Sequence, residues 1–129
     1  PGASAYFVGG VVTYANAWKT GFLGVREETL DAYGAVSAET ADEMVRGLRE
    51  RCSADAGIAV TGIAGPAGGT EEKPVGLVYI ATGIRESVEV RRYVFPGSRD
   101  NIRERTVTVA LHQMRGQLID ERKRAGRTP

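Results

Sequence analysis

Cysteine and histidine are nearly absent from this chain of 129 residues, which has one of each, Cys52 and His112. A single cysteine excludes an internal disulfide and fits a reducing compartment. One cysteine and one histidine also argue against a zinc site, which takes four such ligands when it is structural. Cys52 falls late in a predicted helix, so we interpret it as a packing residue and expect no metal.

Long apolar runs and an excess of one charge are missing as well. No stretch approaches the roughly 18 apolar residues of a membrane span, and no secretion signal is visible, so we expect a cytoplasmic protein without a membrane partner. The 17 Lys and Arg residues nearly balance the 16 Asp and Glu residues, which argues against nucleic acid as a partner. A basic tail at about 121–129 fits a frayed end better than a nucleic-acid contact.

Hydrophobic periodicity predicts helices and strands within one domain that covers residues 1–129. The predicted helices are Asn16–Leu23, Arg26–Tyr33, Ala38–Cys52 and Arg99–Arg122, with Ser37 and Ser98 as N-caps and Gly24 ending the first. The predicted strands are Tyr6–Tyr14, Ala56–Val60, Gly76–Thr82 and Val88–Phe95. Strands in the middle with helices on either side indicate an α/β fold, layered α/β/α, with a mixed sheet.

The last predicted helix has an apolar stripe at helical spacing, which we expect to pack against the sheet. Its members are Ile102, Val107, Ala110, Leu111, Met114 and Leu118. The first turns of the same helix carry Arg99, Arg103 and Arg105, which oppose the helix dipole. A nearby anion and a solvated arginine face are the two interpretations of this pattern.

The start of the sequence predicts that the first elements of the domain are missing. The first residue is proline rather than methionine, and the first predicted strand begins almost at once, at Tyr6. We expect the domain to be N-terminally incomplete, with the first elements of its sheet absent. The exposed sheet edge that this leaves invites pairing, so a homo-oligomer is a candidate assembly.

A glycine-rich segment at residues 61–76 separates two apolar strands. It has five glycines and two prolines in sixteen positions, and loops of this length are uncommon in compact domains unless they are functional or disordered. It matches neither the Walker A sequence nor a dinucleotide fingerprint. Backbone N–H groups in such turns can form an anion-binding nest, to which Thr61, Thr70 and Lys73 would add donors. A structural Ω-loop is the alternative interpretation.

Lys19 lies just past the first predicted strand. A lysine near the end of a strand can act as a general base when burial lowers its pKa, although most lysines are solvated. By default, Tyr14 would be a core or interface aromatic residue, and Ser4 would be an ordinary turn residue.

Taken together, these segments resemble the C-terminal domain of the CinA (competence/damage-inducible) family, which is also found alone as nicotinamide-nucleotide amidase. The resemblance covers nearly the whole chain, and its most specific part runs from Val60 to Gly76. The matching pieces, in the order of the family, are Pro1–Phe7, Gly10–Tyr14, Asn16, Lys19, Leu23–Val25, Gly34–Ser37, Ala59–Pro66, Gly68–Thr70, Glu72–Gly76, Phe95–Gly97 and Ile102–Arg103.

The resemblance implies an amidohydrolase that converts nicotinamide mononucleotide and water into nicotinate mononucleotide and ammonia, with no metal or organic cofactor. It implies acyl transfer with Ser4 as nucleophile, Lys19 as base and Tyr14 as an orienting or relaying group. A second candidate serine of the family lies in a Glu-Ser-Cys-Thr-Gly-Gly motif that is absent from this sequence. Ala15 also stands where the family often has Ser or Thr. The substrate-binding residues that we expect are Thr61, Gly62, Gly65, Gly68, Gly69, Thr70 and Arg103.

A non-catalytic interaction or regulatory domain, in competence or the response to DNA damage, is the alternative function. If the chain begins at Pro1, the absence of one family site motif predicts weak activity or none.

Overall fold

The structure is a computed structural model that describes residues 1–126, and Arg127 of the basic tail lies outside them. Three antiparallel strands form a sheet in the order β1-β2-β3. The elements in chain order are the 3-10 turn η1 (Ala3–Ala5), α1 (Asn16–Leu23), α2 (Glu27–Tyr33), α3 (Ala38–Cys52), β1 (Ala56–Gly62), β2 (Leu77–Ile84), β3 (Ser87–Val94) and α4 (Arg99–Ala125).

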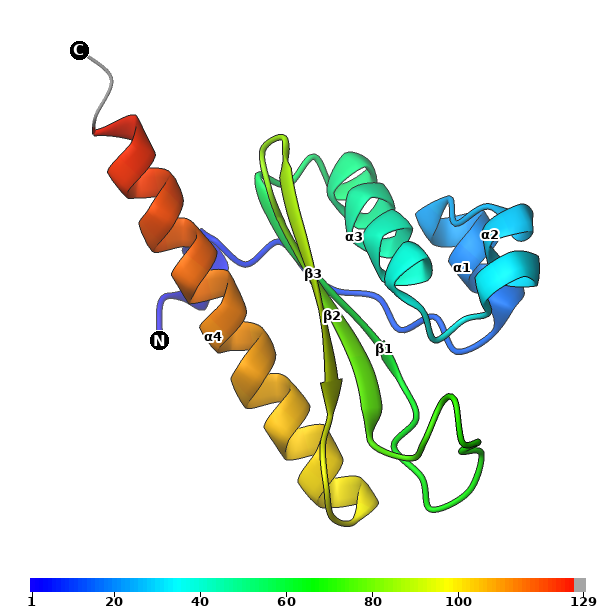
Figure 1. Cartoon of the computed structure of the whole chain (residues 1–129). Helices are drawn as coiled ribbons and strands as arrows, with labels where there is room; N and C mark the ends of the chain where they lie inside the picture. Colours follow the sequence, from blue (N-terminus) through cyan, green and yellow to red (C-terminus); the bar gives the residue numbers. More distant parts are fainter. Residues whose placement is uncertain (127–129) are drawn as a thin grey trace.

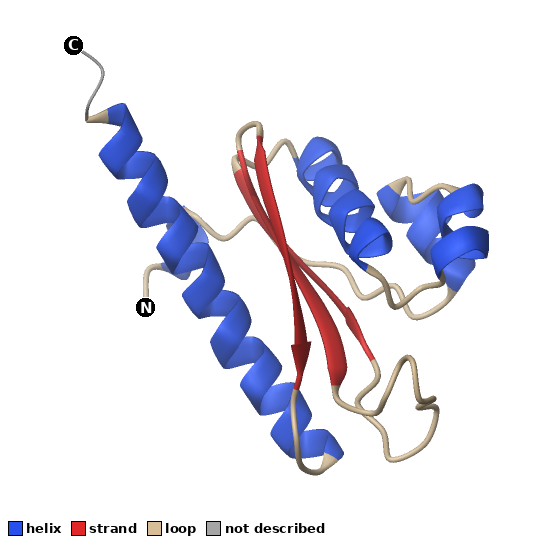
Figure 2. Cartoon of the chain, in the orientation of Figure 1, coloured by secondary structure: helices blue, strands red, loops and turns tan. Residues whose placement is uncertain are grey.

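Helices cover both faces of the sheet, with α4 on one side and α1, α2 and α3 on the other (Figures 1 and 2). Side chains of β2 contribute to the cores on both faces of the sheet, because neighbouring residues of a strand point to opposite faces. Ala81 belongs to the core under α3, whereas Val78 and Ile80 belong to the core under α4. The predicted α/β fold and its layers are confirmed.

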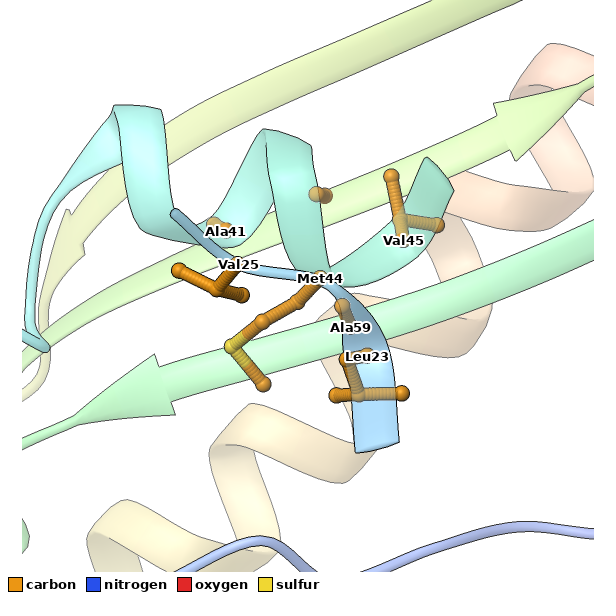
Figure 3. Packing of buried hydrophobic residues seen from close by; sticks show 7 residues of the cluster. Leu23, Val25, Ala41, Met44, Val45 and Ala59 are labelled. Carbon is orange, nitrogen blue, oxygen red and sulfur yellow. The ribbon is translucent and has the colours of Figure 1, made fainter. Parts of the chain in front are cut away.

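The core under α3 also holds α1 in place. Figure 3 shows Leu23 from α1, Met44 from α3 and Ala59 from β1 gathered where the three elements meet. Each of these side chains is at least nine-tenths buried. The N-terminal helices are thus attached to the sheet through α3.

The predicted helix ends are confirmed where local chemistry sets them. Ser37 accepts a hydrogen bond from the Thr40 amide, and Ser98 forms a reciprocal capping box with Asn101 at the start of α4. Gly24 ends α1 in the left-handed region, with φ of 69°. At the C-terminus, α4 continues to Ala125, so the part of the basic tail that is described is helical rather than frayed.

The first predicted strand is wrong, because residues 7–14 have no regular secondary structure. The sheet is consequently antiparallel throughout, where the sequence predicted a mixed one. A strand needs a partner for its backbone groups, and no strand of the described residues pairs with this segment.

The predicted buried stripe of α4 is only partly correct. Ile102 and Ala110 are buried, but Val107, Leu111 and Leu118 are 60%, 59% and 47% exposed. Gln113 and Gln117 are buried in their place because their amide groups bind the sheet. Gln113 Nε2 donates to the carbonyls of Ile80 and Glu89, and Gln117 Nε2 donates to that of Ser87. These side chains rotate α4 away from the orientation that hydrophobicity alone predicts.

Candidate functional site

Among residues 1–126, Lys19 is the one charged residue that is buried, with 7% of its surface exposed. It lies in the first turn and a half of α1, where the chain has just turned back from the irregular segment before it. Nζ donates hydrogen bonds to the carbonyl of Thr13 at 2.5 Å and to that of Tyr14 at 3.2 Å. The lysine therefore fastens the end of the N-terminal segment to α1.

Burial lowers the pKa of Lys19 from its ordinary value of 10.5, because a low-dielectric surrounding disfavours the charged amine. Among residues 1–126, no carboxylate forms an ion pair with Lys19. A nearby carboxylate would raise the pKa again. The amine is thus closer to the neutral form that accepts a proton than a solvated lysine would be.

Lys19 lines a groove of about 570 Å³ that we call the lysine groove. The N-terminal segment, α1, the chain before α3, α3 and β1 all contribute residues to its lining. Its lining residues are 11–14, Lys19, Leu23, Ala35, Val36, Met44, Leu48 and 58–62. Thr61 and Gly62 therefore lie in the same groove as Lys19. Thr61 Oγ1 donates to the carbonyl of Ala35 at 2.7 Å, which orients its side chain.

The glycine-rich loop is tied to helices at two points. Lys73 Nζ donates to the carbonyl of Tyr33 at the end of α2, at 2.6 Å, and Arg99 Nη1 donates to that of Gly65 at 3.1 Å. Within the loop, Thr70 Oγ1 accepts from the amide of Lys73. The Thr70 amide also donates to the Lys73 carbonyl at 2.8 Å. The Thr70 amide and the Lys73 amine, two donors that the sequence suggested for an anion, thus have partners inside the protein, as in a structural Ω-loop.

Two glycines of the loop are required by its own packing. A Cβ at Gly65 would lie 2.5 Å from Cγ1 of Val75, and one at Gly69 would lie 2.6 Å from the Val75 backbone nitrogen. Gly65 also has φ of +76°, and Gly68 has φ of +91°. Substrate binding by Gly65, Gly68, Gly69 and Thr70 stays a prediction, because these features explain the glycines without a ligand.

Arg103 lines a second groove, on the α4 side of the sheet, that we call the apolar groove. It also measures about 570 Å³, and most of its lining is aliphatic: Val12, Ile58, Val60, Gly62, Ala64, Val78, Ile102, Arg103, Thr106, Val107, Ala110 and Leu111. Arg103 makes a long ion pair of 3.8 Å with Asp100 of the same helix. The two grooves share Val12, Ile58, Val60 and Gly62, so they meet at the outer edge of β1.

Ser4 and Lys19 are not brought together. Ser4 lies in η1, and Figure 1 draws η1 well apart from α1, the helix that carries Lys19, with the sheet between them in the view. The side chain of Tyr14 is 83% exposed, and its contact with Lys19 is through the backbone carbonyl. The predicted catalytic set is therefore split into a Lys19–Tyr14 contact and a separate Ser4.

Thr13 and Ala35 are contacts that sequence reasoning did not single out. Both act through backbone carbonyls, toward Lys19 and Thr61, and a backbone contact leaves no signature in residue identity. No group of three or more His, Cys, Asp or Glu side chains within residues 1–126 is placed to hold a metal ion. In the same part of the chain, none of the helices has the length and apolar character needed to cross a bilayer.

Comparison with known proteins identifies the family. The model of the CinA C-terminal domain matches residues 1–118. A competence-damage inducible protein of Moorella thermoacetica is 55% identical over 112 residues, covering 87% of this chain and 27% of that protein. One from Clostridium tetani is 51% identical over 119 residues, covering 92% and 29%.

Solved structures agree in fold. A competence/damage inducible protein from Agrobacterium tumefaciens is 46% identical with a TM-score of 0.79, covering 81% of this chain and 65% of that one. A CinA superfamily protein from Klebsiella pneumoniae is 35% identical with a TM-score of 0.82, covering 86% and 69%. The chain spans under a third of the curated relatives described above. On this combined similarity in sequence and fold, the chain belongs to the CinA C-terminal domain family.

Proposed function

We propose that this chain is an amidohydrolase that converts nicotinamide mononucleotide and water into nicotinate mononucleotide and ammonia. The observation that supports the proposal most is Lys19, a buried amine with a lowered pKa at the wall of an open groove. The lowered pKa leaves more of this amine in the neutral form that can accept a proton than a solvated lysine has. The family resemblance supplies the substrate class.

The reaction proceeds in two acyl transfers. A serine Oγ attacks the carboxamide carbon while Lys19 Nζ accepts the hydroxyl proton. Collapse of the tetrahedral oxyanion breaks the C–N bond, and the proton on Nζ passes to the leaving nitrogen, which departs as ammonia. Water then attacks the acyl-serine ester, Lys19 accepts its proton and returns it to Oγ, and nicotinate mononucleotide leaves.

Ser4 is the nucleophile that we assign within this sequence. Because η1 lies apart from α1 (Figure 1), attack by Ser4 requires the N-terminal segment to bring its hydroxyl into the lysine groove. Tyr14, whose phenol is free in solvent, would orient the serine in that arrangement.

The substrate would occupy the lysine groove next to Thr61 and Gly62. Its phosphate would be held by backbone N–H groups of the glycine-rich loop, at Gly65, Gly68 and Gly69, and by the guanidinium of Arg103, whose own ion pair is long.

The test measures ammonia and nicotinate mononucleotide after incubation of the purified chain with nicotinamide mononucleotide. We expect Lys19→Met, which keeps the aliphatic stem, to lower kcat by a factor of about 10² or more, the usual contribution of a general base. The matched control is Lys123→Met in an exposed stretch of α4, which should leave turnover unchanged. Full activity in Lys19→Met would refute the role of Lys19 as general base. Full activity in Ser4→Ala would refute the role of Ser4 as nucleophile.

A non-catalytic interaction domain is the second candidate. The separation of Ser4 from Lys19 favours it, and the relatives are described as competence-damage inducible proteins. In that case calorimetry detects no turnover heat with nicotinamide mononucleotide, and no ammonia is released by the unmodified chain. Ammonia release by the unmodified chain would rule this candidate out.

A further inference from the structure

The short stretch that leads from the end of α2 to α3 is held by side chains from three other parts of the chain. We call its residues 33–36 the bridging segment. Three successive carbonyls accept side-chain hydrogen bonds: that of Tyr33 from Lys73 Nζ at 2.6 Å, that of Gly34 from Thr40 Oγ1 at 2.8 Å, and that of Ala35 from Thr61 Oγ1 at 2.7 Å. The donors belong to the glycine-rich loop, α3 and β1. The bridging segment therefore fixes these three parts relative to one another.

The bridging segment is also part of the lysine groove, because Ala35 and Val36 line that groove together with Lys19. Gly34, the residue before them, has φ of +79°, a conformation that favours glycine. A Cβ at this position would lie 3.1 Å from Lys73 Nζ, closer than an ordinary contact of about 3.4 Å. The ammonium thus occupies the space beside the glycine, and the position of the groove lining depends on Lys73.

Lys73 is fixed just as closely within the glycine-rich loop. Its amide donates to Thr70 Oγ1 at 3.0 Å, and its carbonyl accepts from the Thr70 amide at 2.8 Å. Thr70 directly follows Gly68 and Gly69, two of the residues proposed to hold the phosphate of the substrate. Within residues 1–126, no carboxylate forms an ion pair with Lys73, so the bond to the bridging segment is the contact that places its ammonium. Lys73 therefore connects the phosphate-binding turn of the loop to the lining of the lysine groove.

We infer that Lys73 is a positioning residue, which sets the separation between the phosphate-binding turn and the lysine groove. This role rests on the proposed function, in which the loop binds the phosphate of nicotinamide mononucleotide while the carboxamide lies beside Lys19. Both ends of one substrate bind at once only when the two parts of the site keep the matching separation. Lys73 takes no part in the proton transfers, because it acts through the backbone of the bridging segment.

Steady-state kinetics of Lys73→Met with nicotinamide mononucleotide test this role. The variant keeps the aliphatic stem and removes the ammonium. We expect KM to rise about tenfold, the effect of losing one hydrogen bond from a charged group. The value of kcat should stay within about twofold, because an interaction that holds substrate and transition state equally changes KM alone. A merely structural role would instead reduce the folded fraction, which lowers kcat and leaves KM unchanged.

Two further variants complete the kinetic test. Lys73→Arg keeps a cationic donor and should hold KM within about threefold of the unmodified chain. Lys123→Met, in the exposed part of α4, is the matched control and should change neither constant. An unchanged KM in Lys73→Met, or a fall in kcat alone, would overturn the inference. A KM in Lys73→Arg equal to that in Lys73→Met would show that the cation is not what positions the loop.

A double-mutant cycle tests the same connection without turnover. Thr61→Val and Lys73→Met each remove one donor to the bridging segment, and urea unfolding gives their effects on the equilibrium constant of unfolding. We expect the double variant to raise this constant about threefold less than the product of the single effects, because both donors hold one segment. Lys73→Met combined with Lys123→Met should give the simple product.

The two measurements separate failure of the inference from failure of the proposed function. If the unmodified chain releases no ammonia and the cycle shows coupling, the proposed function is wrong and the connection between loop and groove is retained. If the effects of Thr61→Val and Lys73→Met simply multiply, the connection is wrong whatever the activity.

Discussion

Gly47 is the point where α3 touches the end of α1, and an alanine there tests the packing that positions Lys19. A Cβ at Gly47 would lie 1.6 Å from the carbonyl oxygen of Leu23 and 2.6 Å from its carbonyl carbon, where ordinary contacts begin at about 3.4 Å. The atoms in the way are backbone, so they cannot turn aside as a flexible side chain would. α1 must therefore move away from α3 by nearly 2 Å.

Two opposing effects decide the sign of the change in stability. Helix propensity alone favours Gly47→Ala by about 1 kcal/mol. Overpacking costs about 1–3 kcal/mol, and partial exposure of Leu23, now 4% exposed, adds a share of the roughly 1.5–3 kcal/mol of its burial. We expect the variant to lose about 2 kcal/mol net, which corresponds to a fall in Tm of about 8 °C for a chain of this length.

The assay is urea unfolding followed by circular dichroism, with Gly116→Ala as the matched control. Gly116 lies within α4, and a Cβ there would meet nothing within 4 Å. The control should gain about 0.5–1 kcal/mol from helix propensity. If the two variants are stabilised equally, the close approach of α1 to α3 is wrong, and so is the placement of Lys19 that depends on it.

Two further predictions concern charged groups. Glu43→Gln should lower the free energy of unfolding at pH 7 by about 1–2 kcal/mol, because the carboxylate accepts hydrogen bonds from the Arg26 backbone and from the Arg26 and Thr29 side chains. Burial opposes ionisation of Glu43, but these bonds prevail and lower its pKa from 4.5. The difference from the variant should therefore shrink as pH falls below about 4.5, and a constant difference in urea midpoints would contradict this origin. For Lys19, the lowered pKa means that the unfolded chain binds the proton more tightly, so wild-type stability should rise relative to Lys19→Met as pH increases toward 10.5. A difference that is flat over that range would show that Lys19 is not buried in solution.

Much of the fold was predictable because its signals are local. Ser37 and Ser98 begin α3 and α4 through bonds to amides three residues away, and Gly24 ends α1 because it adopts a left-handed conformation. The orientation of α4 was not predictable in the same way. Its buried face is chosen by Gln113 and Gln117, whose partners lie on the β2–β3 hairpin some 24–33 residues away.

The same distinction between local signals and partners distant in sequence applies to the candidate site. The stretch from Tyr14 to Lys19 is short, and the contact of the lysine with preceding carbonyls follows from the start of α1. The glycine-rich loop was recognisable as a special segment, but the partners of Lys73 and Arg99 are distant in sequence. The relation between Ser4 and Lys19 depends on the path of an irregular segment, for which no local rule exists.

By itself, the sequence determined the helices, the sheet strands after residue 55, the α/β class and the family. Hydrophobic periodicity, helix caps and the motif from Val60 to Gly76 all depend on residues that are close together in the sequence. Only the tertiary structure decided that Lys19 is buried, that Ser4 lies apart from it, and that residues 7–14 have no strand partner. Burial and strand pairing are properties of what lies alongside a residue in space, and a strand with no neighbour gains no hydrogen bonds to hold it.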